Sequence, residues 1–448
     1  MISEKSYKQR TFLDPIHGPI KLNLSDPVDC LLAKIIDTKE FQRLRRIRQM
    51  GLGWFTFHGA EHTRFGHSIG AMFIAKKMIA HLSNSFEEIN KYRARILVSA
   101  LIHDIGHGPF SHTSEKLLNF NHEQWTMKII QDDSEIHKLL EGFDKNFLND
   151  VLEIMNGKVE AGLPRLYLSQ IISSYVDCDR LDYLHRDSYY VGVPYGLTGS
   201  ERIIASLEVD KVSRGEVTSP LLVINENVGL DAVIHYLHAR YSMYQQVYQH
   251  KKNLACDFLL RKVIERLREI KPKSVPGILF DWLSTYDKPI EKINLNSYLR
   301  VDDFYLMSAI QTLSEDSTVE KILKDLANRF TTRNLFKSLE FRHEVSDQKI
   351  SEVLEKLTST AKNKGFETNF YAGIEQSASK PYEPYQITSK TGKAIFIKQK
   401  NGVVKELSEV SGLVKALSQE NIVKTCLVFT PELEDEISNT KGFQELFK

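Results

Sequence analysis

The sequence contains few cysteines, little net charge and no long hydrophobic run. Four cysteines are scattered through the 448 residues, at positions 30, 178, 256 and 426, and none lies in a CxxC spacing. This usage excludes a disulfide framework and predicts reduced thiols in a cytoplasmic protein. The 59 lysines and arginines nearly balance the 58 aspartates and glutamates. No global field therefore draws the chain to a membrane or to nucleic acid, although a local contact with nucleic acid stays open.

Membrane-spanning and targeting segments are also missing from the sequence. No apolar run approaches the roughly 18 residues that a membrane-spanning helix needs. Met1 leads into a polar stretch, EKSYKQR, so we expect no signal peptide. The length of 448 residues predicts two or three domains and a large buried core.

Helical patterns dominate the first 330 residues. Residues 94–106 are apolar nearly all round, which is typical of a buried helix. Residues 41–51, FQRLRRIRQMG, predict a short helix with arginines around an apolar stripe. Residues 229–270 lack proline and internal glycine, and they predict one or two long helices. We expect strands in this part only near residues 19–24 and 220–229.

The sequence changes character after residue 337. Strand patterns occur at residues 338–344, 368–374, 393–399 and 423–429, and helical patterns at residues 346–365 and 408–419, the first with Ser346 as N-cap. Such alternation predicts an α/β unit. The sequence therefore predicts a mainly α protein with a helical domain at residues 1–337 and a small C-terminal α/β subdomain at residues 338–448.

The stretch LIHDIGHGPFSH, residues 101–112, gathers several reactive side chains. On a helix, His103 and His107 are four residues apart and share a face, with Asp104 beside them. Two glycines and a proline then turn the chain and could bring His112 back over the same place. A lone histidine is usually a packing residue, but packing does not explain four such groups within ten residues. Imidazole nitrogens with a carboxylate suit a divalent transition metal.

Two further stretches offer additional ligands. The segment HGAEHTRFGHS contains His58, His62, Arg64 and His67. The segment SSYVDCDRLDYLHRDS contains Asp177, Asp179, Asp182 and Asp187. On a helix Asp179, Asp182 and Arg186 share a face, so surface ion pairing explains part of this second segment equally well. From these residues alone we infer metal-assisted hydrolysis of a phosphoester.

Taken in order, these motifs resemble the HD-domain deoxynucleoside triphosphate (dNTP) triphosphohydrolases. A lone His-Asp pair would be weak support, because HD proteins perform many reactions. The resemblance covers roughly residues 10–340 and implies an HD-domain helical fold. It runs through DPIHG (14–18), FQRLRRIRQMG (41–51), HTRFGHS (62–68), HDIGHGPFSH (103–112), NHEQW (121–125), DCDRLDYLHRD (177–187), YQHK (248–251) and RNLFK (333–337).

The resemblance implies a divalent metal ion and its protein ligands. The ligands that match the family by position are His67, His103, Asp104 and Asp179. Mg, Mn, Fe, Zn and Ni all stay open as the native metal. The ion would polarise a phosphoryl oxygen and lower the pKa of bound water.

A second group would handle protons and phosphate charge. Its members are His107, His112, Glu115 and His122. His112 is implied as the acid that protonates the leaving 5′ oxygen. His107 and His122 would stabilise the phosphate charge, and Glu115 would orient one of them. Glu115 stands where some relatives have aspartate.

The resemblance also implies a dNTP-binding set. It comprises Gln49, Met50, Arg64, Arg180, Tyr183, Asp187, Arg240, Tyr248 and Lys251. The four cations among them would face the triphosphate. Gln49 and Asp187 would bond the 3′ hydroxyl, and Tyr248 would crowd the 2′ position and exclude ribose. Packing within a tyrosine-rich helix is the alternative for Tyr248. Met50 stands where a leucine usually lines the base and sugar.

A regulatory nucleotide site is the last implication. In relatives a guanine nucleotide lies between subunits and drives assembly. The matching residues here are Asp37, Gln42, Arg45, Arg333, Leu335 and Lys337. A solvated face is the alternative for the arginine-rich helix. The resemblance thus implies a homo-oligomer, and a tetramer in particular, with GTP or dGTP as its effector.

The resulting hypothesis is a metal-dependent dNTP triphosphohydrolase that releases a deoxynucleoside and inorganic triphosphate. One alternative is another HD phosphohydrolase, such as a nuclease or a nucleotidase. A second is a non-catalytic scaffold that binds nucleotides or nucleic acid. Metal analysis and product analysis discriminate these three hypotheses.

Overall fold

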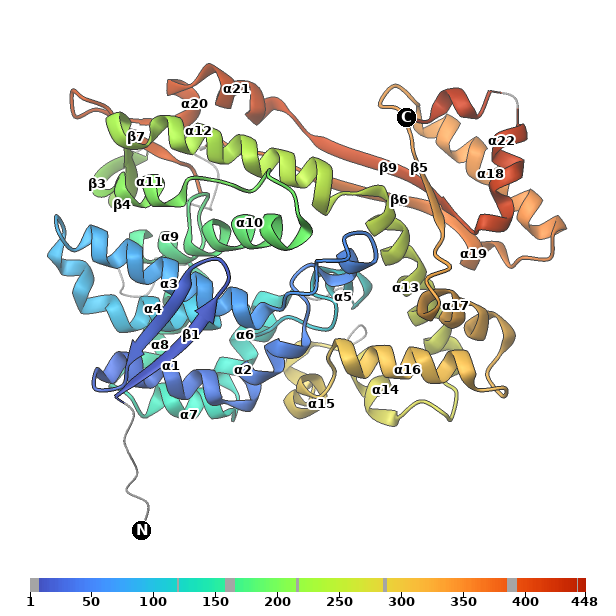
Figure 1. Ribbon diagram of the computed structural model, residues 1–448, viewed down its shortest axis with the longest axis horizontal. Helices are drawn as coiled ribbons and strands as arrows, with labels where there is room; N and C mark the ends of the chain where they lie inside the picture. The colour runs from blue at the N-terminus through green and yellow to red at the C-terminus, as the bar shows by residue number, and fades with distance from the viewer. Residues whose placement is uncertain are drawn as a thin grey trace, which may run out of the picture.

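The computed structural model describes residues 8–118, 121–157, 166–214, 217–284, 288–384, 393–440 and 442–448. Helices dominate these residues, which also form one two-stranded, one four-stranded and one three-stranded sheet. The predicted mainly α fold is therefore confirmed. Figure 1 shows the N-terminal helices in the lower left and the C-terminal strands along the upper edge.

Three helices form the centre of the N-terminal part: α3 (Arg64–Leu82), α4 (Arg93–Ile102) and α10 (Cys178–Val191). Helix α3 packs against both of the others and is buried along most of its length. A Cβ atom on Gly70 of α3 would lie 2.0 Å from Asp182 Oδ1 of α10. Glycine at this position therefore permits the close approach of α3 and α10.

An N-terminal hairpin and two helices adjoin this centre. Strands β1 (Gln9–Asp14) and β2 (Gly18–Asn23) are antiparallel, and Figure 1 shows the hairpin crossing in front of α3. Helix α1 (Pro27–Asp37) is followed by α2 (Lys39–Arg43), whose N-cap is Thr38. The strand predicted near residues 19–24 is confirmed. The short helix predicted over residues 41–51 is only partly right, because α2 ends at Arg43, a 3-10 turn covers Leu44–Arg46 and residues 47–50 are not helical.

The long helical pattern forms two helices. Helix α12 (Glu226–Met243) continues into a π-helical turn at Tyr244–Tyr248, and α13 (Lys251–Ile270) follows. Helices α16 (Asp303–Glu315) and α17 (Lys321–Thr331) pack together, and α17 also contacts α13.

Shorter helices complete the helical part. They are α5 (His112–Leu118), α6 (His122–Gln131), α7 (Glu135–Glu141), α8 (Phe147–Asn156), α9 (Leu166–Ile172), α11 (Ser200–Ala205), α14 (Gly277–Leu283) and α15 (Leu295–Leu299). None of the helices in the described ranges is long and apolar enough to cross a membrane.

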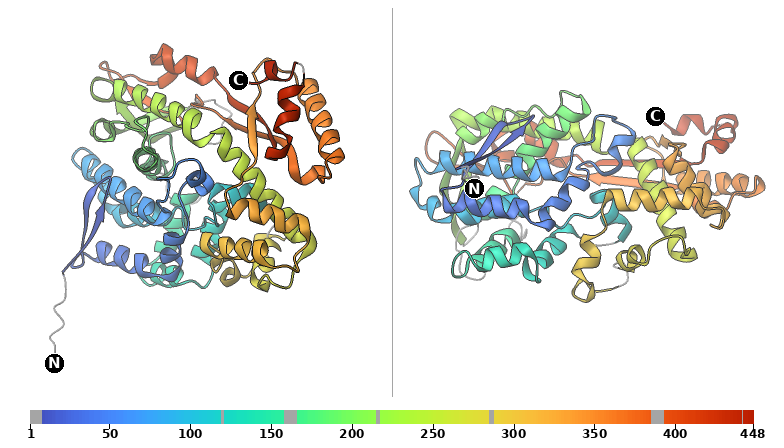
Figure 2. Two further views of the ribbon diagram at one scale, coloured as in Figure 1. Left: turned by 45° about the vertical axis from the view of Figure 1, so that its right-hand side comes forward. Right: turned by 60° about the horizontal axis from the view of Figure 1, so that its bottom comes forward.

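The C-terminal strands belong to two different sheets, one of which also contains β3 and β4 from the helical part. One sheet has the order β3-β4-β7-β8 and the other β5-β9-β6. Their bounds are β3 (Leu207–Arg214), β4 (Val217–Asn225), β5 (Lys337–Glu340), β6 (Ala372–Ser379), β7 (Phe396–Lys398), β8 (Val404–Glu406) and β9 (Ile422–Phe429). The C-terminal helices are α18 (Asp347–Asn363), α19 (Thr368–Tyr371), α20 (Leu407–Val410), α21 (Gly412–Gln419) and α22 (Glu434–Asn439). Figures 1 and 2 show β6 and β9 as long strands between the region of α12 and the helices α18 and α22.

The strand expected at residues 368–374 is partly wrong. Residues 368–371 form α19, and β6 begins at Ala372. Phe370 and Tyr371 are both buried in the core that includes α13. A strand would point these neighbours to opposite faces, whereas one helical turn allows both to enter the same core.

C-terminal residues share two cores with the helical part. Strand β7 pairs in parallel with β4, and Ile397 joins the core around α3. Phe336, Cys426 and Val428 join the core that includes α13. The domain boundary at 337/338 stays a prediction, but the two parts are packed as one continuous body at these contacts.

Candidate active site

Four side chains from three parts of the chain converge at the predicted metal site. His67 comes from the first turns of α3, His103 and Asp104 from the end of α4, and Asp179 from the start of α10. His67 Nε2 lies 3.1 Å from Asp179 Oδ1, 3.3 Å from His103 Nε2 and 3.4 Å from Asp104 Oδ2. The structure therefore brings all four predicted ligands together. His67, His103 and Asp104 offer ligand atoms within 4.8 Å of one another, and Asp179 Oδ1 adjoins both imidazoles. Two imidazoles with carboxylates fit a divalent metal ion.

The electrostatics of this cluster favour bound positive charge. Burial alone would raise the pKa of Asp104, but Arg64 and the neighbouring imidazoles hold that pKa well below its ordinary value. Burial would lower the pKa of His67, but hydrogen bonds to Asp104, Asp179 and Asp182 raise it well above its ordinary value. The carboxylates thus stay ionised and hold protons on the histidines, and a metal ion would replace those protons.

Asp182 supports the cluster from behind. Its Oδ2 accepts a hydrogen bond of 2.8 Å from His67 Nδ1, and Arg186 donates to both of its oxygens at 2.8 and 2.9 Å. The surface ion pair expected for this helix face is wrong, because Asp182 is 0% and Arg186 1% exposed. Sequence reasoning missed this role; Gly66 and Gly70, which open space for the pair, were the available signal.

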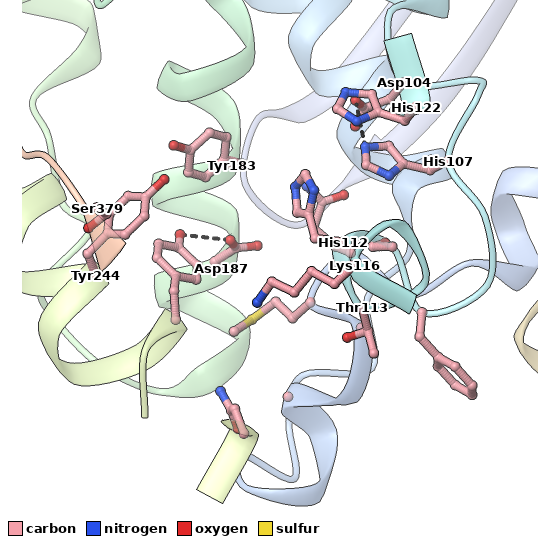
Figure 3. Close-up of a pocket in the computed structure, with 18 of the residues that line it drawn as sticks. Asp104, His107, His112, Thr113, Lys116, His122, Tyr183, Asp187, Tyr244 and Ser379 are labelled. Atoms are coloured by element: carbon pink, nitrogen blue, oxygen red, sulfur yellow. Dashed lines mark hydrogen bonds and ion pairs between the residues drawn. The ribbon is translucent and has the colours of Figure 1, made fainter. Parts of the chain in front are cut away.

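The second predicted group is built around Glu115. Its Oε2 lies 2.8 Å from His112 Nδ1, and its Oε1 lies 2.5 Å from His122 Nδ1. The ring of His107 stacks on that of His122 with centroids 3.9 Å apart. All four predicted side chains are therefore adjacent, and Figure 3 shows three of them, the histidines, around one side of the cavity.

The path of the chain between the two clusters differs from expectation. Helix α4 ends at Ile102, so His103 and His107 do not share a helix face. His107 lies in the following turn, with its Nε2 3.4 Å from Asp104 Oδ1. Phe110 and Ser111 then adopt positive φ angles of 58° and 53°. These left-handed residues reverse the chain and place His112 beside His107, as the glycine and proline pattern suggested.

Three buried contacts hold this reversed loop. Phe110 N donates to Asp303 Oδ1 at 2.7 Å, and Arg43 Nη1 donates to the His107 carbonyl at 2.7 Å. Tyr298 Oη donates to the Gly106 carbonyl at 2.6 Å. Left-handed backbone at a non-glycine residue costs free energy, which surrounding contacts must offset. Residues 298–303 thus position the catalytic loop from a distance of almost 200 residues in sequence, which no local motif reveals.

The charge states of the Glu115 cluster follow from its contacts. Burial lowers the pKa of His107 well below its ordinary value, and Arg64 and His122 add to this shift. Burial would raise the pKa of Glu115, but hydrogen bonds from His112 and His122 lower it. A carboxylate only accepts hydrogen bonds, so the Nδ1 atoms of His112 and His122 carry protons. Their Nε2 atoms remain available for a substrate.

A cavity of about 460 Å³ connects the clusters with the predicted sugar site. Asp187 accepts a hydrogen bond of 2.8 Å from Tyr248 Oη and lies 2.7 Å from His62 Nε2. Figure 3 shows Asp187 across the cavity from His112. Gln49 Oε1 is buried and has no hydrogen-bond partner among the described residues. The cavity lining also includes Met50 and Tyr183.

The predicted phosphate cations divide into two pairs. Arg64 and Arg180 line the cavity; Arg64 donates to Ser111 Oγ at 2.8 Å and also to Asp104. Arg240 and Lys251 are outside the lining residues. Arg240 donates to the Pro381 carbonyl, and Lys251 starts α13.

Sequence reasoning also missed part of the cavity lining. Lys116 and Asp257 line it, with Lys116 Nζ 3.8 Å from Asp257 Oδ2. Ser377 and Ser379 of β6 line it as well. Lys116 follows Glu115 directly, but its partner lies on α13, so only the tertiary fold reveals the pair.

The residues matched to the regulatory site lie in two groups. Asp37 accepts hydrogen bonds of 2.7 and 2.8 Å from Arg10, and Gln42 accepts one of 2.9 Å from Arg45. Arg333 donates to the Phe55 carbonyl at 2.9 Å. Leu335 packs against the core around α13, and Lys337 Nζ lies 3.4 Å from Glu434. The first group runs from the last residue of α1 to the turn after α2, and the second follows α17.

Comparisons with known proteins identify the family of this chain. Residues 64–187 match the HD domain family. The uncharacterized protein YwfO of Bacillus subtilis is 34% identical over 418 residues, which are 92% of this chain and 90% of YwfO. Human SAMHD1, a deoxynucleoside triphosphate triphosphohydrolase, is 28% identical over 279 residues, which are 55% of this chain and 43% of SAMHD1. A phosphohydrolase from Bacteroides thetaiotaomicron superposes with a TM-score of 0.75 and 27% identity, covering 94% of this chain and 99% of that one. The chain therefore belongs to the HD-domain phosphohydrolase family, among its dNTP-triphosphohydrolase-like members.

Proposed function

We propose that this protein is a metal-dependent dNTP triphosphohydrolase. Water attacks the α-phosphorus, the bond from that phosphorus to the 5′ oxygen breaks, and a deoxynucleoside and inorganic triphosphate leave. The main support is one observation: the cavity has the metal and Glu115 clusters on one side and the Asp187–Tyr248 pair on another. The activity named for SAMHD1 supports the same substrate class.

The residues divide the catalytic work. His67, His103, Asp104 and Asp179 would hold a divalent ion, which polarises a phosphoryl oxygen and lowers the pKa of bound water. His112, oriented through Nδ1 by Glu115, presents Nε2 to the leaving 5′ oxygen and gives it a proton. Before that step His112 must be protonated on both nitrogens.

Positive charge for the triphosphate comes from the cavity wall. Arg64 and Arg180 line the wall near Asp104 and Asp179, and guanidinium groups bond phosphate oxygens well. His107 is kept neutral by burial and by Arg64. It therefore acts as a hydrogen-bonding group toward phosphate and not as a cation.

The sugar site favours deoxyribose. Tyr248 Oη donates to Asp187 Oδ2 at 2.8 Å. This hydrogen bond fixes the ring, which the resemblance expects to lie beside the 2′ carbon of the sugar. Gln49 Oε1 and Asp187 accept hydrogen bonds, as a 3′ hydroxyl requires. The unpartnered state of Gln49 Oε1 among the described residues is consistent with a ligand donor at that point.

The direct test separates products after incubation with each of the four dNTPs and with GTP, in the presence of Mn²⁺. We expect deoxynucleoside and triphosphate from dNTPs, and little from GTP. Asp104→Ala serves as the inactive control. Hydrolysis of nucleoside monophosphates, cyclic nucleotides or nucleic acid, with dNTPs untouched, would favour the alternative HD hydrolase. Metal-free protein that binds nucleotides without hydrolysis would favour the scaffold.

We further propose that a guanine nucleotide promotes assembly and activity. Asp37 can accept hydrogen bonds from the guanine edge, and Arg45, Arg333 and Lys337 can hold phosphates. Asp37 now bonds Arg10, so an effector must compete with that arginine. The two groups of residues lie on different elements, and in our proposal one nucleotide contacts them on neighbouring subunits. Such a ligand binds the assembled state better and so favours a homo-oligomer, which we propose is a tetramer.

Light scattering with and without GTP or dGTP tests assembly, and turnover of a second dNTP tests activation. Arg45→Ala and Asp37→Ala are expected to remove the activation and to retain the metal. A monomer with full turnover that is indifferent to guanine nucleotides would exclude this regulatory proposal and leave the catalytic one standing.

A further inference from the structure

We propose that His17, at the tip of the N-terminal hairpin, is a positioning residue of the metal site that acts on His67 through Asp182. The inference rests on the proposed metal site and is independent of which nucleotide is hydrolysed. It joins the DPIHG segment to the chemistry, although His17 is not among the expected metal ligands.

One buried carboxylate connects the two histidines. Asp182 Oδ1 lies 2.6 Å from His17 Nε2, and Asp182 Oδ2 lies 2.8 Å from His67 Nδ1. Arg186 donates to the same two oxygens. The side chains of His17, Asp182 and His67 are 7%, 0% and 0% exposed. Each carboxylate oxygen therefore has one imidazole and one guanidinium partner.

The arrangement fixes which nitrogen of His67 faces the metal site. Asp182 accepts from Nδ1, so that nitrogen keeps its proton, and Nε2 is the atom that would bind an ion once the ion has replaced the second proton. A carboxylate behind a metal-binding histidine orients the ring and raises its basicity. Without His17, Asp182 Oδ1 would keep only Arg186, and the carboxylate would be freer to rotate away from His67.

The hairpin places His17 firmly. Asp14 Oδ1 accepts from the backbone N–H of Ile16 at 2.9 Å and of His17 at 3.0 Å. Asp14 Oδ2 accepts from Arg186 Nη1 at 2.9 Å. The His17 ring also packs on Phe73 of α3, with centroids 5.4 Å apart. Simple packing would not need a polar nitrogen directed at a buried carboxylate, whereas a positioning role does.

The experiment measures Mn²⁺ affinity of the full-length chain, prepared metal-free, by isothermal titration calorimetry. His17→Ala is expected to weaken Mn²⁺ binding about 10- to 100-fold, the range found for comparable supporting groups. His17→Gln can present an amide N–H near the position of Nε2 and is expected to restore most of the affinity. Leu13→Ala, on the same hairpin and 85% exposed in the wild type, is the matched control and should bind Mn²⁺ normally.

Thermal unfolding of the metal-free proteins separates this role from folding. Support requires that a folded His17→Ala binds weakly and that His17→Gln binds better. If His17→Ala does not fold, His17→Asn is compared with His17→Gln instead. Asparagine is too short to reach Asp182, so it should bind Mn²⁺ weakly, whereas glutamine reaches Asp182 and should bind it better. Equal Mn²⁺ affinity in the wild type and a folded His17→Ala or His17→Asn would overturn the inference, as would loss of folding in every variant. A wild type that binds no Mn²⁺ would instead refute the metal site itself.

Discussion

The metal cluster and the Glu115 cluster are neighbours, yet they are supported in different ways. The metal cluster draws on α3, α4 and α10, and its His67 side chain is fully buried. The Glu115 cluster comes from residues 107–122 alone, and its His112 side chain is 64% exposed. A metal site needs rigidly held ligands and keeps one side open, as the 29% exposed Asp179 side chain does here, whereas a group that exchanges protons must itself be accessible to the substrate.

The charges of the clusters differ as well. Asp104 and Asp179 have lowered pKa values despite burial, because Arg64 and the histidines stabilise their charge. His107, between the clusters, has a pKa well below its ordinary value because of burial. His107 therefore lies between the two clusters as a neutral side chain.

Removal of a metal ligand is expected to have the largest effect. Asp104→Ala should abolish hydrolysis and lower the bound metal, because a ligand and its charge are lost together. Elemental analysis of the purified protein and a product assay measure the two effects. Wild-type metal stoichiometry with full activity would exclude the site.

Loss of His112 should distinguish the role of the Glu115 cluster in turnover from the role of the metal cluster in binding. His112→Ala is expected to reduce turnover about 100-fold or more, while metal and nucleotide binding stay close to wild type. Single-turnover kinetics and nucleotide titration provide the measurement. If affinity falls and turnover at saturation does not, His112 is a binding residue and the division of labour is wrong.

Glu115→Gln tests the orientation of the histidines. Glutamine keeps the shape but can accept on only one atom, so His112 and His122 cannot both donate to it. We expect turnover to fall by about 10-fold or more, with metal content unchanged. An unchanged turnover would show that the Glu115 hydrogen bonds are dispensable.

Tyr248→Ala should alter selectivity more than rate. Removal of the ring opens the space expected beside the 2′ carbon, so the ratio of kcat/KM on a dNTP to that on the matching ribonucleotide should fall about 10-fold, corresponding to about 1.4 kcal/mol. Tyr248→Phe, which keeps the ring and loses only the bond to Asp187, is the matched control and should retain most selectivity. An unchanged ratio in Tyr248→Ala would remove this assignment.

The smallest expected effect is a change with pH in the free energy of unfolding. It comes from Asp303, which contacts the loop that carries the Glu115 cluster. Burial raises the pKa of Asp303 to about 7, although the N–H groups of Arg48 and Phe110 favour its charged form. The folded state thus binds the Asp303 proton more tightly than the unfolded chain. Its stabilising contribution is complete below about pH 4 and is lost as the pH rises through about 7.

Asp303→Asn removes this titration. The free energy of unfolding of the wild type, measured relative to Asp303→Asn, should therefore fall by about 1–2 kcal/mol between pH 5.5 and 8. Urea denaturation at both pH values measures the difference. A difference that is constant with pH would show that Asp303 does not titrate in this range.

Local sequence predicted many residues of the candidate site, but few of the distant residues that hold them in place. His103, Asp104, His107 and His112 were recognisable because reactive residues crowd one short stretch. Asp182 looked like half of a surface ion pair, since helical periodicity shows a shared face but not what packs against it. The helix shared by His103 and His107 was wrong because the turn after Ile102 depends on distant contacts.

The fold shows the same limit. Apolar periodicity was sufficient for α4, α12 and α13, and Ser346 is the N-cap of α18, with its side chain accepting from Lys349 N. The short helix α19 was missed because the burial of both Phe370 and Tyr371 depends on the neighbouring α13. The parallel pairing of β4 with β7 joins residues about 170 positions apart, and no local pattern encodes such a pairing.

Hydrolysis of a dNTP in water enriched in ¹⁸O tests the central claim most directly. With the Mn²⁺-loaded wild type, mass spectrometry should find one ¹⁸O atom in inorganic triphosphate and none in the deoxynucleoside, because water attacks phosphorus and the 5′ oxygen leaves with the sugar. Release of a deoxynucleoside monophosphate with pyrophosphate, or label in the deoxynucleoside, would contradict the account.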